Sequence, residues 1–221
     1  MIGIIGGMGP LATIRFCKNI FKLTNASKDQ NNIPLLIYND PKIPDRTESI
    51  YNNDNHVRNY LVNISQKLEK NNCSHLVMPC NTAHYWANDI QQSVNIPFIN
   101  MINETMIFMK NKNFKSFGLL STKGTIKTKI YENYLNNYDL RIKYPNDHDI
   151  NKISNIIYSI KSNNINKKQT CELLKIIDKI NSDCIVLGCT ELPLVMKKSN
   201  YIIDPMNILA SKVLKIHKDN I

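Results

Sequence analysis

Short apolar runs alternate along the chain with longer stretches in which apolar residues recur at helical spacing, as Leu173, Ile176 and Ile177 do. The apolar runs predict strands at Ile2–Ile5, Pro34–Tyr38, His75–Met78, Phe98–Ile99, Ser116–Leu120, Leu140–Lys143, Cys184–Leu187 and Tyr201–Ile203. The stretches between them predict helices at Leu11–Leu23, Val57–Lys70, Trp86–Ser93, Glu104–Lys110, Ile126–Tyr134, Ile150–Ser162, Lys167–Ile180 and Met206–His217. Such alternation is typical of βαβ units, so we expect an α/β protein with mainly parallel sheets.

The pattern also indicates an internal duplication. The strand His75–Met78 leads through Pro79 into Cys80, and the strand Cys184–Leu187 leads through Gly188 into Cys189. We therefore expect two similar, flavodoxin-like α/β lobes whose strand ends face one another, since ligands of such sheets bind beyond the carboxyl ends of the strands. One lobe is predicted to hold residues 1–99 together with a returning C-terminal helix at 206–221, and the other residues 100–205.

The charge and the length of the apolar runs bear on whether the protein binds nucleic acid or a membrane. The 221 residues carry a formal net charge of +10, but the lysines are scattered over many segments and no nucleic-acid-binding motif accompanies them. We expect a solvated basic surface and no nucleic acid. The chain enters a strand at once, and no apolar run is long enough to span a bilayer, so we predict a cytoplasmic protein without a membrane partner.

A glycine-rich turn, Gly6-Gly7-Met8-Gly9-Pro10, follows the first predicted strand. With Ala12, and with Asp40 near the end of the second strand, it matches a dinucleotide-binding fingerprint at a few positions. Glycine turns are common at this place in α/β folds, however, and the free backbone donors of a helix N-terminus suit any anion, including a carboxylate. We favour the more general anion-binding interpretation.

Two of the six cysteines are placed differently from the others. No C-x-x-C pair or Cys/His cluster with zinc spacing occurs, so we expect neither a disulfide framework nor a metal site. Cys73 and Cys184 fit the core, and Cys17 and Cys171 lie within predicted helices. Cys80 and Cys189 each lie where a strand passes into a helix, a position at which helix-terminal N–H groups favour a thiolate.

A pair of opposed thiols suits proton transfer at a carbon atom. One thiolate removes the α-proton from one face of the substrate while the opposite thiol delivers a proton to the other face. The pKa of a free thiol, about 8.5, can be lowered toward working pH. Backbone N–H groups and hydroxyls around the α-carboxylate would stabilise the developing carbanion.

The sequence resembles the aspartate/glutamate racemase superfamily over nearly its whole length. The resemblance rests on Ile4–Pro10, Pro79–His84 and Leu187–Leu192, with further similarity at Pro44–Thr47, Gly118–Thr125 and Asp204-Pro205. It implies two lobes related by a pseudo-two-fold axis, a site in the cleft between them, catalysis without pyridoxal phosphate or any other cofactor, and a homodimer. Glutamate racemases carry Asp-Ser-Gly after the first strand and His after the second Cys-Thr. Gly7-Met8-Gly9 and Glu191 stand at those places here, which favours the aspartate racemase branch.

The resemblance also implies the substrate contacts. Arg46, placed in a predicted loop, is a candidate for binding the side-chain carboxylate, although an exposed loop charge is the alternative. Lys161 either binds the distal carboxylate or complements a helix dipole. Asn81, Thr82, Thr122 and Thr190 are expected around the α-carboxylate, and Met8 completes the set. Glu191 is expected either to tune Cys189 or to cap the following helix.

The leading hypothesis is an aspartate racemase in which Cys189 serves the L-enantiomer and Cys80 the D-enantiomer. A racemase with broader or different amino-acid specificity is the alternative within the class, because two thiols specify the proton transfer and not the side chain. A non-catalytic dicarboxylate-binding protein is the alternative from another class, although binding alone needs neither thiol. His84 is either an acid/base group or a packing residue, and we favour packing because it lies beside Tyr85 and Trp86 on a predicted helix.

Overall fold

Two parallel sheets form the frame of the protein in a computed structural model that describes residues 1–196 and 199–219. The first sheet has the strand order β2-β1-β3-β4, and the second has the order β6-β5-β7-β8. The strands are β1 (Ile2–Gly6), β2 (Leu35–Asn39), β3 (His75–Val77), β4 (Phe98–Ile99), β5 (Ser116–Ser121), β6 (Arg141–Lys143), β7 (Cys184–Gly188) and β8 (Ile202–Ile203). The predicted α/β fold with two lobes is confirmed, and every predicted strand is present.

The two sheets repeat one topology. In each, the first strand in sequence lies between the second and the third, and the fourth lies at the edge beyond the third. All described pairings between named strands are parallel, with Ile4 beside Ile37 and Val77 in one sheet and Leu119 beside Val186 in the other. β1 and β7 are buried along their whole length, as expected of central parallel strands covered on both faces. The repeat places β3 and β7, which precede the two cysteines, at equivalent positions.

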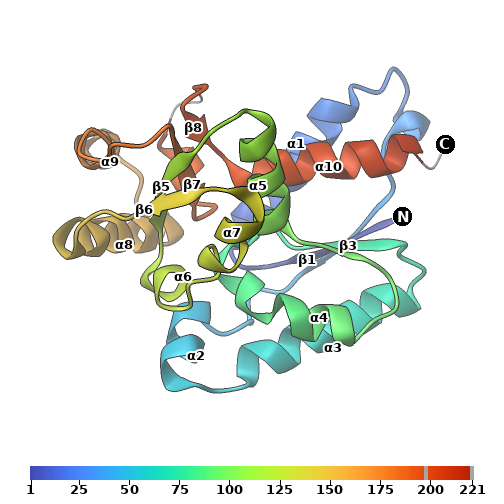
Figure 1. The fold of residues 1–221 in the computed structure, drawn as a ribbon. Coiled ribbons are helices and arrows are strands. Elements are labelled where there is room, and N and C mark those ends of the chain that lie inside the picture. The colour runs from blue at the N-terminus through green and yellow to red at the C-terminus, as the bar shows by residue number, and fades with distance from the viewer. Residues whose placement is uncertain (197–198, 220–221) are drawn as a thin grey trace.

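Helices cover both sheets (Figure 1). They are α1 (Pro10–Thr24), α2 (Arg46–Asn52), α3 (His56–Lys70), α4 (Ala87–Gln92), α5 (Met101–Asn111), α6 (Lys123–Lys127), α7 (Leu135–Tyr138), α8 (Asp147–Lys161), α9 (Lys167–Ile177) and α10 (Pro205–Asp219), with 3-10 turns η1 (Asp29–Asn31), η2 (Thr82–Trp86), η3 (Glu132–Tyr134) and η4 (Leu192–Leu194). The long helices are amphipathic: α3 buries Val57, Leu61 and Leu68 on one face. No helix in the described part of the chain is long and apolar enough to cross a membrane.

Two local predictions were wrong. The single helix predicted at Ile126–Tyr134 is broken, because Lys129 adopts a left-handed conformation (φ 52°) that ends α6, and only short turns follow it. The predicted loop around Arg46 is the start of α2, whose N-cap Asp45 accepts a hydrogen bond from the backbone N–H of Glu48. The Asp45…Glu48 spacing is itself a helix-start signal.

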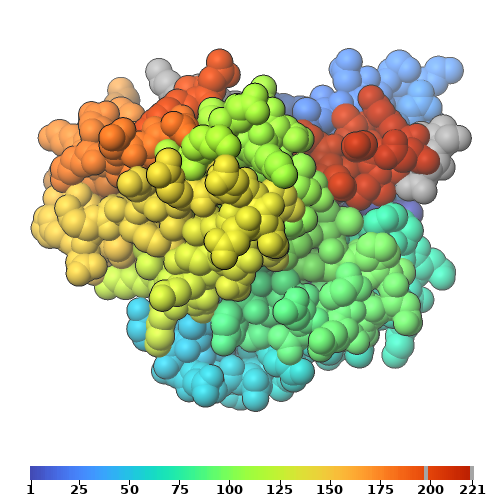
Figure 2. All heavy atoms as spheres, in the orientation of Figure 1, coloured from blue at the N-terminus to red at the C-terminus, as the bar shows by residue number. Residues whose placement is uncertain are grey.

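The last helix, α10, packs against the first lobe. Its residues Met206, Leu209 and Val213 share a core with Ile4 of β1 and Phe16 of α1. Figures 1 and 2 show α10, in red, beside the blue N-terminal helix and the green α5. Because α10 packs against α1 and also against α5, the division into 1–99 plus 206–221 and 100–205 stays a prediction; residues 197–198 and 220–221 lie outside the described parts.

Gly7 is required by a close approach between two loops. Its φ is +102°, and a Cβ atom there would lie 2.0 Å from the backbone oxygen of Asp40. We therefore expect Gly7→Ala to destabilise the protein by at least about 3 kcal/mol, because the clash is with backbone and the conformation disfavours L side chains. Urea unfolding measures this loss.

Gly9→Ala is the matched control. A Cβ atom at Gly9 would meet only Glu191 Oε1, at 3.5 Å, and φ is −97°. We expect it to change the free energy of unfolding by less than about 1 kcal/mol. Equal losses for the two variants would contradict the packing described for Gly7.

Candidate active site

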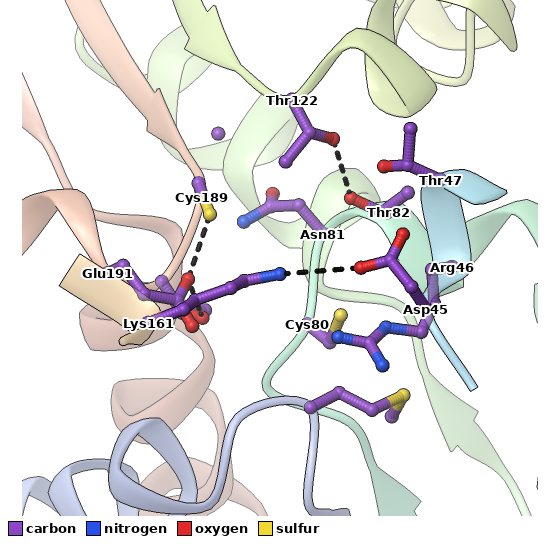
Figure 3. A pocket seen from close by; sticks show the side chains of 13 residues that line it. Asp45, Arg46, Thr47, Cys80, Asn81, Thr82, Thr122, Lys161, Cys189 and Glu191 are labelled. Atoms are coloured by element: carbon purple, nitrogen blue, oxygen red, sulfur yellow. Dashed lines mark hydrogen bonds and ion pairs between the residues drawn. The ribbon is translucent and has the colours of Figure 1, made fainter. Parts of the chain in front are cut away.

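All ten residues predicted from the sequence to form the site line one small cavity between the carboxyl ends of the two sheets (Figure 3). The predicted residues are Met8, Arg46, Cys80, Asn81, Thr82, Thr122, Lys161, Cys189, Thr190 and Glu191, and Asp45, Thr47 and Gly188 join them. The side chains nearly fill the cavity, leaving a free volume of about 10 Å³. That is room for about one water molecule.

The two cysteines lie just after equivalent strands of the two sheets. Cys80 follows β3 and Cys189 follows β7, and each is 6% exposed. In Figure 3 their sulfur atoms are seen on opposite sides of the Lys161 side chain. Of the other cysteines, Cys73 and Cys184 are buried in the core, as predicted, and Cys171 is exposed on α9.

The surroundings of the two thiols differ in charge. Burial raises the pKa of the Cys80 thiol, and the Arg46 guanidinium, the backbone N–H of Ala83 and Lys161 oppose this effect. Burial raises the pKa of Cys189 well above its ordinary value, and the Glu191 carboxylate raises it further. The pKa of both thiols is raised overall; among the neighbouring charges, the Arg46 guanidinium acts most strongly on Cys80 and lowers its pKa, whereas the Glu191 carboxylate acts most strongly on Cys189 and raises its pKa.

Glu191 contacts the Cys189 thiol directly. The Sγ atom donates to Glu191 Oε2 at 2.8 Å, and the Thr190 hydroxyl donates to the same oxygen at 3.1 Å. Glu191 precedes the turn η4 without capping it by its side chain. Of the two roles expected for Glu191, tuning Cys189 or capping the following helix, the structure shows the contact with Cys189.

Arg46 and Lys161 bring positive charge to the cavity from opposite lobes. Arg46 is 8% exposed, so the exposed-loop alternative is wrong, and its guanidinium donates to the backbone oxygens of Ile43 (3.2 Å) and Pro44 (2.8 Å). Lys161 ends α8, and its Nζ lies 3.9 Å from Asp45 Oδ2. Burial lowers the pKa of Lys161, but the nearby Cys189 and Glu191 outweigh it and the net pKa is raised, so the ammonium stays charged.

Three threonine hydroxyls join the lobes beside the cavity. Thr82 Oγ1 lies 3.0 Å from Thr122 Oγ1 and 2.9 Å from Thr125 Oγ1, and the latter two are 3.1 Å apart. All three residues are buried. Near them α2 packs closely on α6: a Cβ atom added at Gly124 would lie only 2.7 Å from Thr47 Oγ1. The lobes therefore meet at the rim of the cavity.

His84 has a structural role. Its Nδ1 lies 2.7 Å from the Cys80 carbonyl oxygen, its Nε2 accepts from the Met101 N–H at 3.0 Å, and its ring packs against Phe98. Burial lowers the pKa of His84 to about 4. The imidazole is thus a neutral bridge between the Cys80 turn and α5, in agreement with the predicted packing role.

The glycine turn after β1 is occupied by contacts within the protein. The Gly7 N–H donates to Thr13 Oγ1 at 3.0 Å, and the Asp40 backbone lies against Gly7. Asp40 Oδ1 accepts from the backbone N–H of Lys42 at 2.9 Å. The turn brings Met8 into the cavity.

Sequence reasoning missed several residues that shape the site. Asp45 and Thr47 lie in the recognised Pro44–Thr47 segment, but only the tertiary structure shows them facing α8 and α6. Arg15 of α1 donates to the Thr190 carbonyl oxygen at 3.1 Å and pairs with Asp204, and so ties the Cys189 loop to the first lobe. No local pattern marks Arg15, because its partners lie 175 and 189 residues away.

Two similar α/β lobes with paired cysteines at one cavity match the arrangement expected of the racemase superfamily, and comparison with known proteins agrees on the family. Residues 5–213 match the model of the Asp/Glu/Hydantoin racemase family. The chain belongs to this family, so the prediction of a racemase is confirmed at the level of the family.

The most informative relatives cover nearly the whole chain. An aspartate racemase structure from Picrophilus torridus is 32% identical, with a TM-score of 0.87 over 98% of this chain and 94% of that one. The structure of an aspartate racemase homologue from Pyrococcus horikoshii is 25% identical, with a TM-score of 0.80 over 98% of each chain. The broad specificity amino-acid racemase RacX of Bacillus subtilis is 28% identical over 89% of this chain and 87% of its own length. The structural neighbours fit the aspartate racemase branch.

The neutral state of His84 makes stability depend on pH. An unfolded histidine takes up a proton near pH 6.5, whereas the folded His84 does so near pH 4. Stability from this residue is therefore fully present above about pH 6.5 and lost as the pH falls toward 4, by about 3 kcal/mol in total. Urea unfolding of the wild type and His84→Gln between pH 7 and 4 tests this.

The wild type should lose stability more steeply than His84→Gln over that interval. His148→Gln, which removes an exposed histidine, should follow the wild-type slope. Parallel pH curves for the wild type and His84→Gln would show that His84 is not held neutral by the fold.

Proposed function

We propose that the protein interconverts L- and D-aspartate, with Cys80 and Cys189 as the two acid/base groups and without a cofactor. The observation that carries the proposal is the placement of two buried thiols at equivalent strand ends of two lobes, on one cavity that also holds two cationic side chains. A site for binding alone would need the cations but neither thiol.

Racemisation then consists of two proton transfers. The thiolate on one face takes the α-proton, and the thiol on the opposite face gives its proton to the planar carbanion. The first sulfur becomes a thiol and the second a thiolate, so the charge of the pair is conserved. Following the direction of use that the family resemblance implies, Cys189 serves L-aspartate and Cys80 serves D-aspartate.

Glu191 and Arg46 give the two thiols different tasks. The Glu191 carboxylate, 2.8 Å from Cys189 Sγ, is in place to accept the thiol proton before L-aspartate is deprotonated. Cys80 faces a guanidinium instead, which opposes the effect of burial and so eases ionisation of this thiol. Arg46 would therefore assist the reaction of the D-enantiomer, while Glu191 would assist the opposite direction.

The charges and donors at the cavity fit a dicarboxylate. Arg46 and Lys161 would bind the side-chain carboxylate, and Lys161 would exchange its 3.9 Å contact with Asp45 for the substrate. Asn81, Thr82, Thr122 and Thr190 would surround the α-carboxylate, with Met8 as an apolar wall. Because the cavity leaves about 10 Å³, these side chains must move apart when an amino acid enters.

A broader amino-acid specificity is the second candidate. It is favoured by the similarity to the broad specificity racemase RacX, and the thiol chemistry is the same. The homodimer that the resemblance implies and a cytoplasmic location remain predictions, which light scattering and cell fractionation test.

Hydrogen exchange at the α-carbon in D₂O tests the proposed function. The wild type should incorporate deuterium into both enantiomers of aspartate while optical rotation decays. Cys80→Ser and Cys189→Ser should each lower racemisation by roughly 10²–10⁴-fold, because each removes one acid/base group, and each could retain exchange from a single enantiomer. Cys171→Ser, at an exposed thiol, is the control and should stay fully active.

The outcomes separate the hypotheses. Exchange with other amino acids but not with aspartate would replace the substrate assignment. Full racemisation in either cysteine variant would refute the two-thiol mechanism, and no exchange with any amino acid would refute the proposal of an enzyme.

Glu191→Gln tests the unequal surroundings of the thiols. The variant removes the negative charge that raises the pKa of Cys189, so this thiol should ionise at a lower pH than in the wild type. Alkylation of Cys189 by iodoacetamide, followed by mass spectrometry across pH in a Cys171→Ser background, measures the midpoint. Glu172→Gln, on the surface of α9, is the control and should leave the pH midpoint of Cys189 alkylation unchanged. An unchanged midpoint in Glu191→Gln would exclude the charge effect.

A further inference from the structure

A buried tyrosine of the second lobe contacts the asparagine that follows the first cysteine. Tyr131 is fully buried, and its hydroxyl donates to Asn81 Oδ1 at 2.5 Å. Asn81 is 2% exposed and lines the cavity. Its other amide atom, Nδ2, is buried and has no hydrogen-bond partner among the described residues. One end of the amide is therefore occupied, and the other end is left unused.

An unused buried donor carries a cost in free energy, because it has given up water without gaining an acceptor. Such groups in native proteins call for an explanation, and a ligand acceptor is one of the few that fit a cavity wall. In Figure 3 the amide nitrogen of Asn81 points toward the side on which Cys189 lies, with its oxygen turned the other way. The wall of the cavity thus carries an amide N–H donor that is available to an anionic ligand.

The tyrosine decides which end of the amide faces the cavity. Burial raises the pKa of Tyr131, so its hydroxyl keeps its proton at working pH and donates to the amide oxygen. The ring is fixed in the core of the second lobe beside Phe117, with ring centroids 6.0 Å apart. A reversed amide would turn its oxygen into the cavity, where it would repel a carboxylate.

We infer that Tyr131 is a positioning residue that fixes the amide of Asn81 with its N–H group toward the carboxylate of the substrate. The inference rests on the proposed function and deepens it. Because Tyr131 belongs to the second lobe and Asn81 to the first, the donor is correctly oriented only when the lobes are together. Binding of the carboxylate is thereby coupled to the closed arrangement of the two lobes.

Tyr131→Phe removes the hydroxyl and keeps the buried ring. We expect KM for both enantiomers of aspartate to rise about tenfold with a smaller change in kcat, because a ground-state contact is lost when the amide can rotate. Tyr138→Phe is the matched control: its hydroxyl donates to Asn103 Oδ1 at 2.7 Å, the same chemistry away from the cavity. It should leave KM unchanged.

A double-mutant cycle separates positioning from a general loss of stability. If Tyr131 acts through Asn81, Tyr131→Phe should have no further effect on KM in an Asn81→Ala background. Additive effects, or a wild-type KM in Tyr131→Phe, would overturn the inference. Should Tyr131→Phe fail to fold, Asn81→Ala alone serves instead: a KM that stays at the wild-type value after loss of the amide would overturn the inference.

The failure of this inference differs from that of the proposed function. A wild-type enzyme that racemises aspartate, with a Tyr131→Phe variant of normal KM, refutes the positioning role alone. A wild type without exchange at any α-carbon refutes the proposed function.

Discussion

The burial of two thiols where the lobes meet is the constraint on which the site depends. Parallel strands deliver Cys80 and Cys189 to the same cavity, and the threonine hydroxyls and the contact of α2 with α6 close it. In this closed space each nearby charge acts strongly, because the effective dielectric is low. Burial raises the pKa of both thiols, and the neighbouring charges then separate them.

The symmetry of the frame and the asymmetry of the charges have different origins. The duplicated sheets place the cysteines at matching strand ends. The neighbours are not duplicated: a guanidinium from α2 lies near one thiol, while a carboxylate two residues along the chain accepts from the other. The proposed proton transfer between two faces needs one base and one acid at any moment, and this difference in charge makes the two thiols unequal.

The strands and the cysteine turns could be predicted because their signals are local. Apolar runs identified all eight strands of the described chain, and the strand-to-turn transitions selected Cys80 and Cys189 among six thiols. The predictions of shorter elements were wrong for a physical reason. The helix α2 has seven residues, too few for a clear period, and the break at Lys129 depends on a backbone conformation that no apolar pattern encodes.

By itself the sequence determined the class of fold, the duplication and the placement of two cysteines at equivalent strand ends, because apolar periodicity and turn residues act over a few neighbours. Only the tertiary structure decided the burial of Arg46, the bond from Tyr131 to Asn81, and the link from Arg15 to the Cys189 loop. These contacts join residues that are far apart in the chain or lie on different lobes. Their energies depend on distance and burial, which exist only once the lobes have packed together.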